Sequence, residues 1–331
     1  RKFEREFADW VGVTHAVALS NGTVALELAL KALDIAAGDE VIVTPRSFIG
    51  SASCIVAVGA TPVFADVDRN SQTITADTVR AKLTDRTRAV VCVHIAGMPC
   101  DMDPIIQLAR EHDLKVVEDC AQAHGAEYRG KSVGSLGEIA AWSFCQDKIM
   151  TPGGEGGMVT TSDEELWSRV WSLKDHGKSW DAVYNREHPP GFRWIHESFG
   201  TNGRMLEMQA AIGRIQLQRM PEWRARRISN ASRLAEVCGK HEAVRVPPVP
   251  EDCVHAYYRF YAFVQPGNLA AGWSRDRIIE EIIAREVACY HGTCPEIYRE
   301  KAFAGTKYGQ PERLPTAQEL GETSMMMLVH P

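Results

Sequence analysis

The chain has 331 residues, of which 45% are hydrophobic and 24% charged, and its formal net charge is -6. This length allows two domains, or one large α/β domain with an appendage, around a sizeable core. The negative balance excludes nucleic acid as an expected partner, because binding to a phosphate backbone requires clustered positive charge.

Composition also constrains the compartment and the metal content. No apolar run approaches the roughly 18 residues needed to span a bilayer, and the N-terminus carries no signal-peptide pattern. We therefore expect no membrane partner and a cytoplasmic location. The nine cysteines form no C-x-x-C pair, which predicts reduced core residues instead of a disulfide framework or a metal site.

The first ten residues have the pattern of an amphipathic helix. Phe3, Phe7 and Trp10 recur there at helical spacing. Because this pattern is present from the first residue, we expect the numbering to begin inside a longer natural protein.

Residues 16–161 alternate short apolar runs with helical segments. Several of the runs are apolar throughout, which is typical of a sheet covered on both faces. The alternation predicts an α/β fold with a mostly parallel sheet, whose ligands lie beyond the carboxyl ends of the strands. The predicted strands are 16–19, 40–44, 61–65, 89–93, 115–118, 140–144 and 158–161, and the predicted helices are 24–33, 50–58, 76–83 and 103–112.

The pattern changes after residue 163. A helix at 164–175 precedes a polar, proline-bearing segment at 180–200 that cannot be regular throughout. A long helix over 206–234 is expected to be interrupted or re-aimed near Pro221. The prolines at 247, 248 and 250 predict a boundary between a large domain (1–240) and a small α/β domain (241–331), with a strand at 257–264 and a helix at 275–284.

The first candidate site is the turn Ser20-Asn21-Gly22-Thr23, which opens directly into a helix from Val24. Free amide groups and the helix dipole converge at such a helix start and favour an anion. The alternative interpretation is simple helix capping by Ser20 or Asn21.

The second candidate is Glu118-Asp119, at the carboxyl end of a buried strand, followed by Gln122. Burying an ionised carboxylate there costs folding free energy unless a positively charged group pairs with it. A protonated pyridine nitrogen would serve. The alternative is an acid that pairs with a neighbouring arginine or caps a helix.

The third candidate is Lys148, which follows the strand that carries Ser143 and precedes a glycine turn. A lysine amine with an unperturbed pKa of about 10.4 is a poor nucleophile at pH 7, unless its pKa is lowered or it is stored as a Schiff base. An anion anchor, a buried acid and one lysine together meet the needs of a pyridoxal phosphate site.

Seven segments occur in a familiar order and spacing. They are SNGTVAL (20–26), GDEVIVTPRSFIGSA (38–52), GATPVFADVD (59–68), VHIAGMPCDMD (93–103), VVEDCAQAHGAEYRGKSVGSLG (116–137), WSFCQDKIMTPGGEGGMV (142–159) and GTNGRMLEMQAAIG (200–213). Over residues 7–331 the chain resembles the sugar aminotransferases of the DegT/DnrJ/EryC1/StrS family, which depend on pyridoxal 5'-phosphate. The resemblance implies the fold-type I architecture, with a large domain whose mostly parallel sheet is covered by helices and a small C-terminal α/β domain.

The resemblance also implies a role for each matching residue. Lys148 matches the lysine that binds the cofactor covalently and moves protons in catalysis. Asp119 matches the acid that keeps the pyridine nitrogen protonated, and Gln122 matches the residue that hydrogen-bonds the ring hydroxyl. The remaining cofactor-binding residues implied are Gly22, Thr23 and Val24 with Ser143 at the phosphate, Phe48 stacked on the ring, and Asn202 reaching the phosphate of the partner subunit in a homodimer.

Two positions depart from the family pattern. Gly203 stands where a bulky residue is common, and Cys145 stands where histidine is frequent. The expected activity is transfer of an amino group from an amino acid, most simply glutamate, to a keto group of a nucleotide-linked deoxysugar. Three alternatives remain: an aminocyclitol substrate, an aminated ring precursor, or a non-catalytic regulatory relative.

Overall fold

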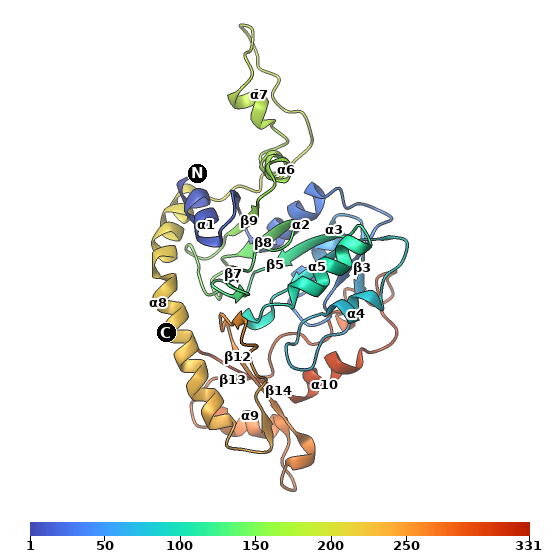
Figure 1. Cartoon of the computed structure of the whole chain (residues 1–331), viewed down its shortest axis with the longest axis vertical. Helices are drawn as coiled ribbons and strands as arrows, with labels where there is room; N and C mark the ends of the chain where they lie inside the picture. The colour runs from blue at the N-terminus through green and yellow to red at the C-terminus, as the bar shows by residue number, and fades with distance from the viewer.

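A computed structural model describes residues 1–331. Its centre is a seven-stranded sheet in the order β1-β9-β8-β5-β4-β2-β3, which confirms the predicted α/β fold (Figure 1). Every predicted strand in this region is present, within two residues at each end. The strands are β1 (His15–Leu19), β2 (Glu40–Val43), β3 (Thr61–Phe64), β4 (Thr87–Val93), β5 (Lys115–Asp119), β8 (Ile139–Ser143) and β9 (Gly157–Thr161).

Strand direction decides where the site can form. Strands β2, β3, β4, β5 and β8 pair in parallel. Strand β9 is antiparallel to both β8 and β1, so β1 runs in the same direction as β8. The carboxyl ends of six strands therefore lie along one edge of the sheet, where ligands of open α/β sheets bind.

Helices cover the sheet because its strands are apolar on both faces. β2, β8 and β9 are buried at every position, and a side chain on either face of a strand needs a packed partner. The helices of this region are α2 (Gly22–Ala32), α3 (Gly50–Ala57), α4 (Ala76–Arg80), α5 (Met102–Glu111) and α6 (Glu164–Lys174).

The N-terminal helix α1 (Lys2–Val11) confirms the amphipathic pattern, since Phe3 and Phe7 are both buried. The Phe3 and Phe7 rings pack 5.6 and 5.4 Å from the ring of Phe144, between centroids. Phe7 also meets Trp142 edge-on at 5.2 Å. Helix α1 thereby packs against the strand that leads to Lys148.

The long helix α8 (Glu207–Cys238) is continuous through Pro221, so the predicted interruption is wrong. Proline removes one amide donor and crowds the carbonyl four residues earlier, a cost that tertiary packing can offset. Leu217 and Met220 before the proline and Arg227 and Ala231 after it are all buried. In Figure 1, α8 runs along one side of the molecule from α1 to the second sheet.

The second sheet consists of β10 (Val244–Arg245), β12 (Phe260–Val264), β14 (Ser324–Met327) and β13 (Cys289–Tyr290), in that order. It carries α9 (Arg275–Ile283) and α10 (Pro315–Thr323). Tyr261 and Phe263 of β12 belong to the same buried cluster as the main sheet. One face of β12 is therefore part of the core of the main sheet, whereas its other face belongs to a separate cluster with α9 and the rest of the second sheet.

Two features complete the fold. A third small sheet joins β6 (Glu127–Tyr128), β7 (Lys131–Ser132) and β11 (Cys253–Val254). Residues 178–200, which we call the arm, contain only the short helix α7 (Trp180–Tyr184) and project from the body in Figure 1. The structure contains no helix with the length and apolar character that a membrane crossing would require.

Candidate active site

The residues singled out in the sequence come together at one edge of the main sheet. Ser20 to Thr23 follow β1, Ser143 ends β8 and precedes Lys148, and Asp119 ends β5. Phe48 follows β2 on the same edge. The parallel arrangement alone explains this convergence, because these strands all end on the same side.

The start of α2 has the helix cap that the sequence suggested, and two of its amides have no partner in the protein. The Asn21 side chain accepts a hydrogen bond from the amide of Val24 at 2.9 Å, so this amide is occupied by the cap. The amides of Gly22 and Thr23 have no acceptor in the protein. Val24 is expected to contribute its amide to a phosphate, and in this structure that amide donates to Asn21, whereas those of Gly22 and Thr23 are unpaired.

Glycine is required at position 22 by a close approach to β8. A Cβ on Gly22 would lie 2.6 Å from the Cβ of Ser143 and 3.0 Å from its Oγ. Gly157 plays the same role from β9, since a Cβ there would lie 2.2 Å from the carbonyl oxygen of Asn21. The Ser143 hydroxyl and the free amides of α2 therefore form one compact cradle.

Asp119 is buried and has two hydrogen-bond donors. Ser51 donates its hydroxyl hydrogen to Oδ2 at 2.7 Å, and the amide of Ala121 donates to Oδ1 at 3.1 Å. Burial raises the pKa of Asp119, while these two hydrogen bonds and the charge of Lys148 oppose the rise. No cation of the protein pairs with this carboxylate, which suits a group that must meet a protonated ring nitrogen.

Gln122 is held in one orientation by the backbone. Its Oε1 accepts a hydrogen bond from the amide of Ala96 at 2.7 Å. The amide nitrogen Nε2 therefore remains as a donor for a ligand. Ala96 has the left-handed backbone conformation, with φ 57°, which is strained for a residue with a Cβ.

Lys148 lies near Tyr258, in the segment just before β12, which the sequence did not single out. Its Nζ is 3.5 Å from Oδ1 of Asp147 and 5.0 Å from the ring centre of Tyr258. Tyr258 donates its hydroxyl hydrogen to Oδ2 of Asp147 at 2.5 Å, and the Arg259 guanidinium stacks 4.0 Å from the same ring. No local signal could have identified Tyr258, because 111 residues separate it from Asp147.

The ring of Phe48 is 64% exposed. Phe48 is therefore not a core aromatic, and its ring is free to stack on a ligand. Asn202 is also exposed and accepts only a hydrogen bond from Nε of Arg204. Its neighbour Gly203 accepts the amide of Ser20, which places this segment beside the end of β1.

The structure explains the departure at Gly203 and shows the surroundings of Cys145. A Cβ on Gly203 would already lie 3.2 Å from Cγ1 of Val24, so a larger side chain would press on the first turn of α2. Cys145 is half-buried, and its thiol donates to Oε1 of Glu155 at 3.4 Å. Burial raises the pKa of the Cys145 thiol, and the nearby Glu155 carboxylate adds to the effect.

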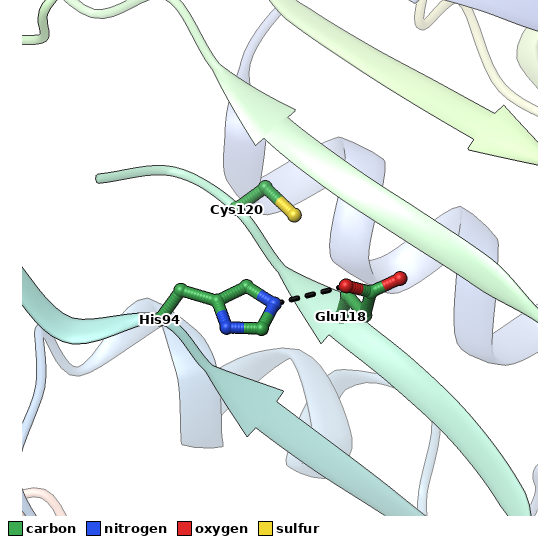
Figure 2. Close-up of side chains that lie close together, drawn as sticks. All are labelled: His94, Glu118 and Cys120. Carbon is green, nitrogen blue, oxygen red and sulfur yellow. Dashed lines mark hydrogen bonds and ion pairs between the residues drawn. The ribbon is translucent and has the colours of Figure 1, made fainter. Parts of the chain in front are cut away.

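Glu118 points away from Asp119, as successive strand residues must. His94, Glu118 and Cys120 lie close together in the interior (Figure 2), with possible ligand atoms within 4.8 Å of one another. The ring nitrogens of His94 and the carboxylate oxygens of Glu118 are already engaged in hydrogen bonds. His94 donates from Nε2 to Glu118 at 3.0 Å and accepts the amide of Cys100 at Nδ1.

The other acceptor positions of Glu118 bind backbone amides. Those of Leu136 and Gly137 donate to Oε1, and that of Gly134 donates to Oε2, each at 2.8 Å. Burial acts to raise the pKa of Glu118, but these hydrogen bonds and His94 outweigh it and hold the pKa below its ordinary value. Glu118 thus fixes the loop at 134–137 and is a structural acid.

The residues at the sheet edge fit pyridoxal phosphate. Unpaired amides at Gly22 and Thr23 with the Ser143 hydroxyl suit the phosphate. Asp119 suits the ring nitrogen and Nε2 of Gln122 suits the ring hydroxyl. Lys148 is the lysine available for covalent attachment.

Comparisons with known proteins agree with this geometry. The chain is 46% identical to GDP-perosamine synthase of Caulobacter vibrioides over 226 residues, which are 68% of this chain and 58% of that protein. It is 38% identical over 309 residues to a protein of Streptoalloteichus tenebrarius described as a putative L-glutamine:3-amino-2,3-dideoxy-scyllo-inosose aminotransferase, with 92% of this chain and 71% of that protein covered.

A solved structure is closer still. The aminotransferase from Psychrobacter cryohalolentis superposes with a TM-score of 0.98 at 59% identity and covers 100% of this chain and 86% of that chain. The chain spans just under three fifths of the Caulobacter protein. The DegT/DnrJ/EryC1/StrS aminotransferase profile matches residues 1–331. The chain belongs to the DegT/DnrJ/EryC1/StrS aminotransferase family, whose cofactor is pyridoxal 5'-phosphate.

Proposed function

We propose that this chain transfers an amino group from an amino acid, most simply glutamate, to a keto group of a nucleotide-linked deoxysugar. The observation that carries the proposal is the meeting of Lys148, Asp119 and the unpaired amides of Gly22 and Thr23 at one edge of the sheet. The substrate class is supported by the similarity to GDP-perosamine synthase.

Each residue has a defined task in this proposal. Pyridoxal phosphate, when bound, supplies an electron sink for the carbon that loses or gains the amino group. Nζ of Lys148 would carry a proton from the amino acid's carbon to the cofactor in the first half of the reaction, and from the cofactor to the sugar's carbon in the second half. Asp119 keeps the ring nitrogen protonated, and Nε2 of Gln122 donates to the ring hydroxyl. Ser143 helps to retain the phosphate.

The test of the catalytic assignment is Lys148→Ala. We expect this variant to lose the visible absorption of the lysine-bound cofactor and to lose amino transfer. Lys178→Ala is a matched control, because Lys178 also lies near an aspartate, with 3.2 Å between its Nζ and Asp175, and is outside the site. Amino transfer retained by Lys148→Ala would refute the proposal.

The substrate is identified by a panel of ketones. The amine-loaded enzyme is mixed with nucleotide-linked 3-keto and 4-keto sugars, and return of the visible absorption reports transfer. A second candidate substrate is an aminocyclitol precursor, favoured by the similarity to the Streptoalloteichus protein. A free keto-inositol in the same panel distinguishes the two, since each proposal expects turnover by one class only.

We further propose an obligatory homodimer in which Asn202 reaches the phosphate of the partner subunit. The support is an apolar surface that a monomer would leave in water. Large side chains exposed on the arm and at the start of α8 are Phe192, Trp194, Phe199, Leu206 and Met208.

The dimer proposal is tested by sedimentation and by Asn202→Ala. We expect a dimer at micromolar concentration and a loss of cofactor affinity of about tenfold or more in the variant, the size of one hydrogen bond to a charged group. Asn185→Ala, which removes an exposed asparagine from the end of α7, should keep its affinity. A fully active monomer would contradict the proposal.

A cytoplasmic location is also proposed. All nine cysteines are free thiols, which suits a reducing compartment. Cell fractionation tests this, and recovery of the protein with disulfides in a secreted fraction would contradict it.

A further inference from the structure

Two buried serines lie next to Asp119. Ser51 and Ser47 are each 2% exposed. Ser51 donates to Oδ2 of Asp119 at 2.7 Å, and the hydroxyl oxygens of Ser47 and Ser51 are 3.0 Å apart. Ser47 lies between β2 and α3, and Ser51 lies in the first turn of α3, 68 residues before Asp119.

The direction of this chain of hydroxyl groups follows from the number of hydrogens. An ionised carboxylate only accepts, so the single hydroxyl hydrogen of Ser51 is directed to Asp119. The bond between the two serines must then be donated by Ser47. Two donors in series polarise each other, which strengthens the bond to the carboxylate.

We propose that Ser51, supported by Ser47, is a positioning residue that keeps Asp119 ionised and oriented toward the ring nitrogen of pyridoxal phosphate. The inference rests on the family's cofactor and does not depend on the sugar substrate. It explains why two polar groups are buried together beside an acid that the reaction needs.

The hydrogen bond from Ser51 affects the pKa of Asp119. Burial raises the pKa of Asp119, and the Ser51 hydrogen bond is the largest influence that opposes the rise. The other titratable groups that act on Asp119 or feel its charge are Lys148, His94, Cys54 and Cys120. Loss of the hydroxyl therefore favours a neutral Asp119, which cannot hold the ring nitrogen protonated.

The segment that carries the serines also carries Phe48. Ser47 precedes it directly, and Ser51 follows one turn later. A ring stacked on Phe48 and an acid held by Ser51 are thus positioned by one short stretch of backbone. This stretch begins α3 and is fixed by the buried Cys54, whose thiol donates to the carbonyl oxygen of Ser51 at 3.4 Å.

The experiment compares Ser51→Ala, Ser47→Ala and the control Ser53→Ala, which removes a hydroxyl from the same helix without a hydrogen bond to Asp119. Two quantities are measured without any substrate. One is the dissociation constant of pyridoxal phosphate as a function of pH. The other is the nitrogen NMR signal of cofactor labelled with 15N in the ring, which reports protonation directly.

For Ser51→Ala we expect binding weakened by about tenfold to a hundredfold at neutral pH, the range for a hydrogen bond to a charged group. The ring-nitrogen signal should move toward the unprotonated form. Tight binding should require a higher pH than in the wild type, because Asp119 without the Ser51 hydrogen bond is ionised only at higher pH. Ser47→Ala should change both quantities in the same direction by less. Ser51→Thr, which keeps the hydroxyl, should restore the wild-type signal.

A purely structural role would look different. Unchanged affinity and an unchanged nitrogen signal in Ser51→Ala, with only a lower melting temperature, would overturn the proposal. If Ser51→Ala does not fold, Ser47→Ala decides, and a wild-type nitrogen signal in that variant overturns it. A Ser51→Thr variant that behaves like Ser51→Ala would show that packing, and not the hydroxyl, is responsible. Because no sugar is present, failure of the proposed amino transfer leaves these outcomes unaffected.

Discussion

Substitution of Gly22 by alanine tests the cradle at the start of α2. The added Cβ would lie 2.6 Å from the Cβ of Ser143, and 3.1 Å from its Cα. Carbon atoms in contact are normally about 3.5–4.0 Å apart. The start of α2 and the end of β8 must therefore separate by about 1 Å, and they cannot do so without moving the free amides relative to the Ser143 hydroxyl.

The expected effects can be sized from this displacement. Overpacking of this kind costs about 1–3 kcal/mol of folding free energy. Loss of one charge-assisted hydrogen bond to the phosphate weakens cofactor binding by about tenfold to a hundredfold. Helix propensity alone would predict that the substitution stabilises the fold, since alanine is a better helix former than glycine.

The assay is a titration of pyridoxal phosphate followed by absorbance, with thermal unfolding measured at zero and saturating cofactor. Gly267→Ala is the control, because a Cβ at that glycine would meet nothing within 4 Å. We expect the control to match the wild type in both measurements. If Gly22→Ala binds the cofactor with wild-type affinity and unfolds at the same temperature, the cradle has been assigned wrongly.

Three further predictions concern buried groups. Glu118→Gln should lower the free energy of unfolding by about 2–6 kcal/mol in a denaturant titration, because an amide nitrogen replaces an oxygen that accepts two N–H groups. The pKa of Glu118 is lowered in the folded state, so its contribution is present above its ordinary pKa of about 4.5 and is lost as pH falls below it. The stability of the wild type should therefore decline more steeply in acid than that of Glu118→Gln; equal slopes would contradict the assignment. Arg46→Met should leave the free energy of unfolding nearly unchanged, because relief from burying two unpaired terminal nitrogens offsets the lost hydrogen bond from Nε to Gln72; a loss above about 3 kcal/mol would contradict this reasoning. Tyr258→Phe should lower turnover at near-normal cofactor affinity, because it removes the hydroxyl that donates to Asp147 and accepts from Arg259 but keeps the ring beside Lys148; unchanged kinetics would exclude a role at Lys148.

Much of the site was predictable because its residues carry local signals. The strand that ends at Asp119 is a run of buried residues closed by an acid, and such a carboxylate requires a partner. The turn before α2 combines an N-cap residue with a glycine. The strands themselves are short apolar runs at regular intervals. These patterns depend on neighbours in sequence, so the sequence alone determined them.

What the local pattern missed depends on distant partners. The hydroxyl of Ser51 meets Asp119 across 68 residues and that of Tyr258 meets Asp147 across 111. The continuity of α8 through Pro221 follows from packing on both sides of the proline, against the local propensity.

The sequence by itself therefore determined the elements, their order and the chemical groups at the ends of the strands. Tertiary structure alone decided how those groups are used. The amide of Val24 donates to the side chain of the N-cap residue Asn21. Oε1 of Gln122 accepts from the amide of Ala96, which leaves Nε2 of Gln122 without a partner. The physical reason is that a hydrogen-bonding group is assigned by whichever partner the folded chain brings within about 3 Å, and only the packed structure sets those distances.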